Sequence, residues 1–175
     1  IAGTGPYENY LRNKARDMGL GDKMFFTGYL SNDDRDMLYL TASVAVFPSL
    51  YEPFGIVALE AMAAGTPVVV SDSGGLAEIV KHEEDGLHAI TGSASSLADQ
   101  ILRVLKNDFL AKKLRDNALQ KIKTMYDWRV IARKTAEVYD AVVRENSARW
   151  RDAGRISWIP SRSKKYDYRG KGVIS

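Results

Sequence analysis

Two carboxylates and a glycine lie close together in residues 48–65, in the first half of the chain. Glu52 and Glu60 are separated by seven residues, and Gly55 lies between them. Residues 56–64 are apolar apart from Glu60, so the helix expected there is largely buried. A carboxylate on such a helix must face a crevice or find hydrogen-bond donors, and sugar hydroxyls would serve. The alternative is a Glu60 that lies on a narrow exposed strip or pairs with an arginine of the core.

Gly55 marks the expected start of that helix, after a short loop that follows a strand. Open sheets of parallel strands bind ligands at the carboxyl ends of the strands. The free amide groups at a helix N-terminus attract anions, and a glycine lets a ligand approach the backbone closely. Glu52 would then lie over the mouth of the crevice and Glu60 on its floor, one or two turns down the helix. By itself, Glu52 would also fit an exposed loop.

Short apolar runs alternate with helical patterns along the chain, which predicts an α/β fold with a mostly parallel sheet. Ser31, followed by Asp33 and Asp34, has the composition of a helix start. Five strands are expected: one that ends at residues 1–2, and others at residues 23–27, 43–47, 67–70 and 87–90. Helices are expected at residues 6–18, from Ser31, at residues 55–64, and repeatedly from Ala94 to about residue 147.

Other patterns that could carry chemistry favour simpler interpretations. Asp34-Arg35-Asp36 has the spacing of a metal-binding pair of acids, but acids in the first turn of a helix are explained by its dipole. Gly3-Thr4-Gly5 lacks the third glycine of a dinucleotide-binding fingerprint, because Glu8 occupies that position.

His82 and His88 flank an acidic turn without the spacing of a metal site, so we expect them to be exposed, with proton transfer as the alternative. Ser73-Gly74-Gly75 is interpreted as a turn at a strand end, with a diphosphate contact as the alternative.

Charge is distributed unevenly along the 175 residues, whose net charge is +3. Nine Lys and Arg against three acids give residues 144–175 a charge of +6, which leaves residues 1–143 at −3. The body therefore lacks the basic surface of a nucleic-acid-binding protein. The sequence contains no cysteine, which excludes disulfides and thiolate metal sites and is compatible with a reducing cytosol. Its apolar runs are too short to span a bilayer.

The motif Glu52-x7-Glu60, with Pro53-Phe54-Gly55 inside it, resembles the E-x7-E motif of the GT4 family of retaining glycosyltransferases, which have the GT-B fold. The match covers roughly residues 1–145, and several linked motifs in the correct order make it specific. In chain order these further motifs are residues 1–6, 26–30, 61–69, 74–80 and 85–86.

The resemblance implies that the chain is most of the C-terminal, donor-binding half of such an enzyme. Residues 1–147 would form a Rossmann-like parallel sheet flanked by helices, without its first βα unit, and residues 148–175 a basic aromatic tail. The reaction would be retaining transfer of a sugar, of the hexosyltransferase type, from a nucleotide diphosphate to a glycan, a lipid-linked sugar or a small molecule. No metal or other cofactor would be required.

By the same resemblance, Glu52 would be the catalytic carboxylate beside the transferred sugar, and Glu60 would bind the ribose hydroxyls of the donor. Backbone amides at the start of the helix would face the sugar hydroxyls and the distal phosphate, and residues near Gly28 would contact the base. The expected donor-binding residues are Glu60, Phe54, Gly55, Ile56, Val57, Gly3, Gly5, Gly28, Tyr29, Gly74 and Gly75.

The family also places an Arg and a Lys on a unit before Gly3, and the acceptor in an N-terminal domain. Because the chain begins with Ile, within an expected strand, we interpret it as an excised or truncated chain that is inactive alone. The tail, which contains Trp150 and Trp158, would dock on that N-terminal domain or make a peripheral membrane contact, and the enzyme would be cytoplasmic. A nucleotide-sugar donor and an acceptor are the expected partners, and no nucleic acid. A non-catalytic GT-B partner subunit and a GT-B sugar-nucleotide epimerase stay open as alternatives.

Overall fold

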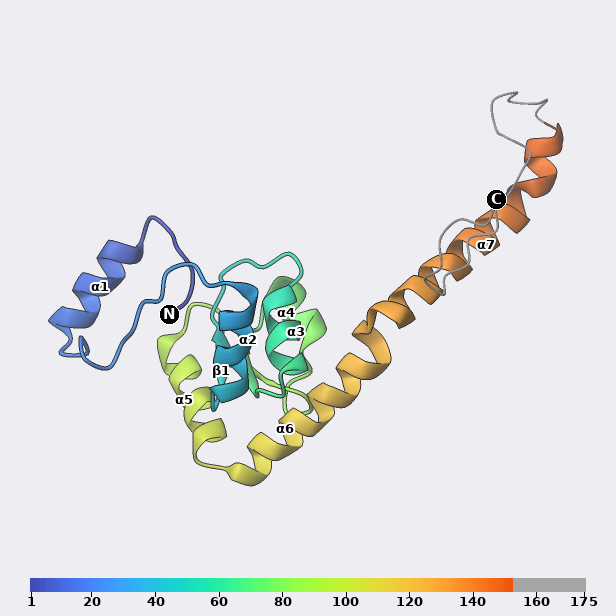
Figure 1. The fold of residues 1–175 in the computed structure, drawn as a ribbon. Coiled ribbons are helices and arrows are strands. Elements are labelled where there is room, and N and C mark those ends of the chain that lie inside the picture. The colour runs from blue at the N-terminus through green and yellow to red at the C-terminus, as the bar shows by residue number, and fades with distance from the viewer. Residues whose placement is uncertain (153–175) are drawn as a thin grey trace. The chain divides into compact units, whose positions relative to one another are not determined.

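The computed structural model describes residues 1–152, with side chains up to residue 146 (Figure 1). The chain divides into two compact units, Ile1–Val130 and Ile131–Ser175. The first unit contains the sheet and the helices that pack on it. Helix α7 (Trp128–Asp152) starts at the end of the first unit and forms the described part of the second. The boundary that we predict at residue 147 stays a prediction.

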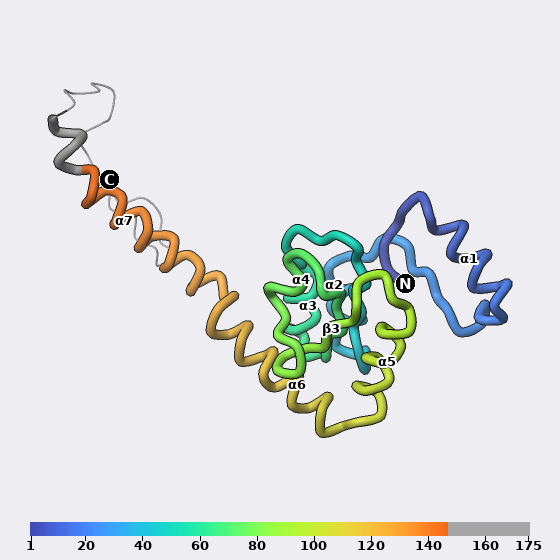
Figure 2. Tube along the Cα trace, turned by 180° about the vertical axis from the view of Figure 1, so that it is seen from behind, coloured from blue at the N-terminus to red at the C-terminus, as the bar shows by residue number. Residues whose placement is uncertain are grey.

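The sheet has three parallel strands in the order β1-β2-β3, with β2 in the centre. In the register of the sheet, Ala45 lies beside Val68 and Val69 beside Leu87. Figure 2 shows β3 from behind. The strands are β1 (Ala45–Phe47), β2 (Val68–Ser71) and β3 (Leu87–Ala89).

Helices cover both faces of this sheet, which confirms the predicted α/β fold. Val68 and Val70 of β2 pack against α3 and α4, whereas Val69 points to the other face and packs against α5 and α6. A sheet buried on both faces needs strands that are apolar at every position, which is why β2 is a run of valines. These helices are α3 (Ile56–Ala63), α4 (Gly74–Ile79), α5 (Ala94–Leu105) and α6 (Asp108–Lys121), followed by the π-helical turn η1 (Ile122–Tyr126).

Helix α2 (Asn32–Thr41) begins after Ser31, as predicted. The Ser31 Oγ accepts a hydrogen bond from the Asp34 amide at 3.2 Å and donates one to the Asp34 carboxylate at 2.6 Å. Near the other end of the helix, Tyr39 packs against the core with its ring edge-on to Phe47, the two centroids 6.4 Å apart. The Thr66 hydroxyl donates to the Tyr39 carbonyl. These contacts fix which face of α2 lies toward the sheet and α3.

The strand predicted at residues 23–27 is wrong. Helix α1 (Glu8–Asp17) forms, but residues 24–27 are irregular and only Gly28 makes bridges, to Ala2 and Gly3. The strand end predicted at residues 1–2 is likewise reduced to isolated bridges. A strand is stable as part of a ladder, and among the described residues the only bridges near this segment join Gly28 to Ala2 and Gly3.

Helix α7 reaches Asp152, past residue 147 where we expect the helical pattern to fail. The remainder of the predicted basic aromatic tail lies outside the described residues. Within the described part of the chain, no helix is both long enough and apolar enough to cross a membrane.

Candidate functional site

The loop between β1 and α3 ends at Gly55, the residue before the first turn of α3. Gly55 has a φ of +93°, a left-handed conformation that a side chain would strain. A Cβ at this position would also lie 2.8 Å from the Leu76 Cδ2 atom of α4. Gly55 therefore allows both the turn into α3 and the close packing of α4 beneath it.

The Glu52 carboxylate lies at the N-terminus of α3. Its Oε1 atom accepts a hydrogen bond from the Gly55 amide at 3.2 Å, with the Phe54 amide at 3.5 Å. The positive end of the helix dipole favours a negative group here. Two of the amides that we expect to face a donor are thus occupied by Glu52, and an incoming anion would compete with this carboxylate.

Gly74 and Gly75 begin helix α4 instead of forming only a turn, and they touch the Glu52 loop directly. The Gly75 amide donates to the Glu52 carbonyl at 2.8 Å. A Cβ on Gly74 would lie 2.5 Å from that carbonyl oxygen, and one on Gly75 would lie 2.5 Å from the Phe54 Cα. Both glycines are therefore required by backbone packing, whatever their contact with a ligand.

Helix α3 is not buried all round, contrary to the prediction. Its Ala58 and Met62 are fully buried, but Ile56 is 59% and Val57 39% exposed. The helix lies over one face of a sheet of only three strands, so the side of its first turn that points away from the sheet stays open. The predicted donor-binding side chains at this turn are therefore accessible.

Glu60 lies on α3 with its side chain 28% exposed, and its Oε1 atom is 3.2 Å from the Nη1 atom of Arg35. The alternative that Glu60 pairs with an arginine is thus what the structure shows, although the pair is half-buried rather than in the core. Both side chains line a pocket of about 320 Å³. The pocket is completed by Asp36, Leu40, Ala63 and Ala64.

Charge partners shift two pKa values around this pocket. The hydrogen bond to Asp36, and then the charge of Glu60, raise the pKa of the Arg35 guanidinium, so it stays charged at every accessible pH. Burial, and then the charge of Glu60, raise the pKa of the Tyr39 hydroxyl. The pocket therefore keeps a permanent cation beside the predicted ribose-binding carboxylate.

The predicted base-side residues form a separate group. The Gly3 amide donates to the Gly28 carbonyl at 2.8 Å, Gly3 and Gly5 line a pocket of about 230 Å³, and Tyr29 is 82% exposed. Among the residues that the structure describes, no hydrogen bond joins this group to Glu52. The structure thus joins Glu52 to Phe54, Gly55 and Gly75 by hydrogen bonds and places Gly74 against the Glu52 carbonyl, but it does not bond the base-side glycines to this group.

Asp72 is a residue at this edge of the sheet that we do not predict from the sequence. It follows β2, and its Oδ1 atom accepts hydrogen bonds from the Thr91 amide at 2.8 Å and the Thr91 hydroxyl at 2.6 Å. These bonds lower the pKa of the Asp72 carboxyl. The signal for it is its position, an acid directly after a buried strand, where open α/β sheets hold their ligands.

His82, on the loop between α4 and β3, lies beside His88, the middle residue of β3. The His88 amide donates to His82 Nδ1 at 2.8 Å, and the ring centroids are 5.5 Å apart. The His82 side chain is 41% exposed, and its partial burial, together with the charge of His88, lowers its pKa. In the described part of the chain, no three His, Asp or Glu side chains are grouped as a metal site would require.

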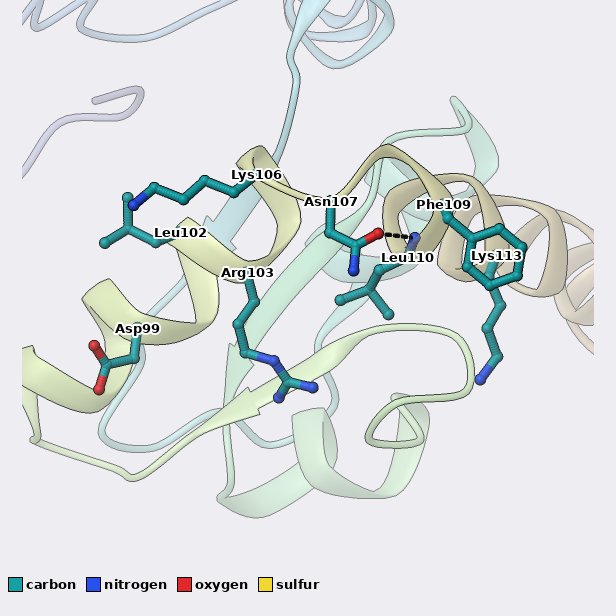
Figure 3. A pocket seen from close by; sticks show the side chains of 8 residues that line it. All are labelled: Asp99, Leu102, Arg103, Lys106, Asn107, Phe109, Leu110 and Lys113. Atoms are coloured by element: carbon teal, nitrogen blue, oxygen red, sulfur yellow. Dashed lines mark hydrogen bonds between the residues drawn. The ribbon is translucent and has the colours of Figure 1, made fainter.

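A pocket of about 570 Å³ is lined by none of the predicted site residues (Figure 3). It lies at the junction of α5 and α6, where the Asn107 side chain caps α6 by accepting from the Leu110 amide at 2.9 Å. Two of the three basic side chains that line this pocket, those of Arg103 and Lys113, already bind Glu83. Arg103 pairs with the Glu83 carboxylate, and Lys113 donates to the Glu83 carbonyl. We therefore assign the candidate site to the strand ends and not to this pocket.

The chain is similar to known glycosyltransferases. An uncharacterized glycosyltransferase of Methanocaldococcus jannaschii is 45% identical over 139 residues, which are 79% of this chain and 36% of the relative. The solved structure of sucrose-phosphate synthase from Thermosynechococcus elongatus is 34% identical with a TM-score of 0.73, over 82% of this chain and 37% of that one. Anabaena HepE in complex with UDP-glucose is 27% identical with a TM-score of 0.74, over 80% and 40% of the two chains.

The chain thus spans about a third of the length of its curated relatives. These neighbours confirm the predicted sheet flanked by helices and the resemblance to GT-B glycosyltransferases. The sequence pattern of the family described as glycosyl transferases group 1 matches residues 1–121. The chain belongs to the glycosyl transferases group 1 family.

Proposed function

We propose that this chain is the donor-binding part of a retaining glycosyltransferase that moves a sugar from a nucleotide diphosphate to an acceptor. The observation that carries the proposal is the anion-binding end of α3. Its amides at Phe54 and Gly55 already hold a carboxylate, that of Glu52, and they lie at the carboxyl edge of a parallel sheet. The structural likeness to Anabaena HepE, solved with UDP-glucose, supports a donor of this chemical class.

In this proposal a diphosphate oxygen of the donor replaces the Glu52 carboxylate at the α3 amides. Glu52 turns toward the transferred sugar, and Glu60 accepts hydrogen bonds from the ribose hydroxyls. The exposed Phe54, Ile56 and Val57 cover the donor from the side of the helix N-terminus. The positive end of α3 stabilises the charge that develops on the leaving diphosphate.

The remaining predicted residues complete the donor site. Gly74 and Gly75 hold the Glu52 loop in place through their backbone contacts. The Gly3, Gly5, Gly28 and Tyr29 segment contacts the base.

The reaction exchanges one bond at the anomeric carbon for another. The bond from that carbon to the distal phosphate oxygen breaks, and the nucleoside diphosphate leaves with the electron pair. A hydroxyl oxygen of the acceptor forms the new bond on the same face, and its proton passes to the released diphosphate or to water. The helix amides supply the electrostatic stabilisation, so the proposal needs neither a metal nor another cofactor.

The enzyme is, in this proposal, of the hexosyltransferase type, with a glycan, a lipid-linked sugar or a small molecule as its acceptor. Because the chain spans about a third of its curated relatives, we propose that transfer requires the complete protein. We propose that the reaction takes place in the cytoplasm, with nucleotide sugars as its donor substrates.

The test is a thermal-shift screen of the complete protein against UDP-glucose, ADP-glucose and GDP-mannose. A ligand at about a hundred times its dissociation constant stabilises the fold by about 2.7 kcal/mol, which raises the unfolding temperature by several degrees. We expect one nucleotide family to produce this shift in the wild type and Glu60→Ala to abolish it.

The matched control is Glu137→Ala, which also removes a glutamate paired with an arginine, here Arg133 on α7. This variant should keep the full shift. A folded wild-type protein that responds to none of the three nucleotide sugars contradicts the proposed function and favours a non-catalytic partner subunit. A shift that survives in Glu60→Ala contradicts only the role of Glu60.

A further inference from the structure

Arg35 is a residue of α2 that reaches the predicted donor site from a second element. It lies one turn before Tyr39, and side chains four residues apart on a helix lie on the same face. Tyr39 packs against the core beside Phe47, so the face that carries both residues lies toward the sheet and α3. The packing of Tyr39 thus determines that Arg35 extends toward Glu60.

Neighbouring residues on α2 hold the Arg35 guanidinium in position beside Glu60. Its Nε and Nη2 atoms donate to the Asp36 Oδ1 at 3.1 and 2.9 Å. Its Nη1 donates to the Asn32 Oδ1 at 3.3 Å and lies 3.2 Å from the Glu60 Oε1. A planar guanidinium with its donors engaged in this way has little freedom to move. It therefore offers Glu60 a cation in a fixed position.

Only one oxygen of Glu60 takes part in this pair. Oε1 faces Arg35, and among the described residues no hydrogen bond reaches Oε2. A carboxylate anchored by one oxygen keeps the other for a ligand, in a direction that the anchor defines. The same pairing offsets the negative charge of Glu60, which would otherwise repel a nucleotide diphosphate.

We propose that Arg35 is a positioning residue of the donor site: it orients the Glu60 carboxylate for the ribose hydroxyls and offsets its charge. The inference rests on the proposed function, because it assigns Arg35 a task in binding the same donor. If the Arg35–Glu60 pair serves only to join α2 to α3, its loss changes the stability of the protein and leaves donor affinity unchanged. Donor affinity therefore separates the two roles.

The experiment measures donor kinetics of Arg35→Gln in the complete protein with UDP-glucose, replaced by GDP-mannose or ADP-glucose if the thermal screen selects one of these. We expect the KM for the donor to rise about tenfold while kcat stays within about twofold, because a binding contact is lost and not one formed only in the transition state. Arg35→Lys keeps the charge but lacks the several fixed N–H donors of the planar guanidinium, so it should recover part of the affinity. If Arg35→Gln does not fold, the Lys variant carries the test.

The control is Arg103→Gln, which breaks another Arg–Glu pair between two elements, that of Arg103 with Glu83. Its donor KM should match that of the wild type. A double-mutant cycle with Glu60→Gln, read as the dissociation constant of the same nucleotide sugar, tests the coupling directly. Once Glu60 is neutral and lacks its pairing, Arg35→Gln should weaken binding by less than about twofold.

Two results would overturn the inference: a donor KM of Arg35→Gln equal to that of the wild type, or an equally large loss in the Glu60→Gln background. A wild-type protein that binds no nucleotide sugar overturns the proposed function instead. Donor binding by the wild-type protein therefore shows whether the proposed function has failed or only the inference about Arg35.

Discussion

The charged residues of this protein differ in solvent exposure, and this difference determines whether a pair is available to a ligand or stabilises the fold. The side chains of Arg35 and Glu60 are each about 30% exposed, so this pair is accessible to a ligand. The pair between Lys121 Nζ and Asp85 Oδ2, at 2.7 Å, has side chains only 15% and 7% exposed. Asp85 also accepts from the Lys81 amide at 2.7 Å. This second pair joins α6 to the loop before β3 and has a structural role.

At this scale we predict that Lys121→Met lowers the free energy of unfolding by about 3–5 kcal/mol, because it leaves the Asp85 carboxylate buried without its cation. Urea denaturation measures the loss. Lys112→Met is the control, since Lys112 pairs with Asp116 at the surface, and its cost should stay below about 1 kcal/mol. Equal losses in the two variants would show that burial does not distinguish the pairs.

At the scale of elements, the short helix α4 determines the position of the Glu52 loop. Its Leu76 fills the space left by the missing side chain of Gly55, and its Gly75 donates to the Glu52 carbonyl. The hydrogen bond between Gly75 and Glu52 is made by backbone atoms, which cannot rotate away as a side chain can. A small change at the start of α4 should therefore be transmitted to the helix amides of the candidate site.

We predict that Gly75→Ala destabilises the protein by about 1–3 kcal/mol and weakens binding of UDP-glucose by the complete protein, because the new methyl group displaces the backbone at Phe54. Thermal unfolding and ligand titration measure the two effects. Gly21→Ala is the matched control: a Cβ there meets nothing within 4 Å, so stability should change by less than about 0.5 kcal/mol. A Gly75→Ala variant that binds UDP-glucose as tightly as the wild type would show that α4 does not position the candidate site.

At the scale of the whole molecule, stability in acid depends on His and Asp groups whose pKa values are shifted downward. Burial and His88 lower the pKa of His82, and hydrogen bonds from Thr91 lower that of Asp72. The hydrogen bond from the Arg129 side chain lowers the pKa of Asp127 to about 2. In each case the unfolded chain binds protons more readily than the folded one, so stability falls as pH falls.

We therefore predict two stages of acid destabilisation. The first begins below about pH 6.5, where unfolded His82 becomes protonated and folded His82 does not, and solvent screening keeps it small. The second begins below about pH 4 with the carboxyls and continues to about pH 2, where folded Asp127 takes up its proton. Urea unfolding from pH 7.5 to about pH 2 measures the profile.

His82→Gln should remove the first stage and leave the second. The chain contains only two histidines, which makes this assignment direct. Stability that rises between pH 7 and pH 5 would contradict the sign predicted for His82.

Local patterns in the sequence determined a large part of this protein. The apolar residues 67–70 predict a strand, Ser31 followed by acids predicts the start of α2, and Gly55 predicts the start of α3. Each of these depends on neighbours along the chain, through side-chain periodicity, helix capping or backbone conformation. The order of the motifs also predicted the family, because linked motifs constrain one another.

Only the tertiary structure decided how these elements meet. Residues 23–27 have the composition of a strand but lack a ladder to join. Arg35 and Glu60 are 25 positions apart, and the packing of Tyr39 brings them together. The occupation of the α3 amides by Glu52 depends on a loop whose path is held by Gly75. Contacts between distant residues form only when the chain has packed, and a sequence pattern that describes neighbours contains no measure of them.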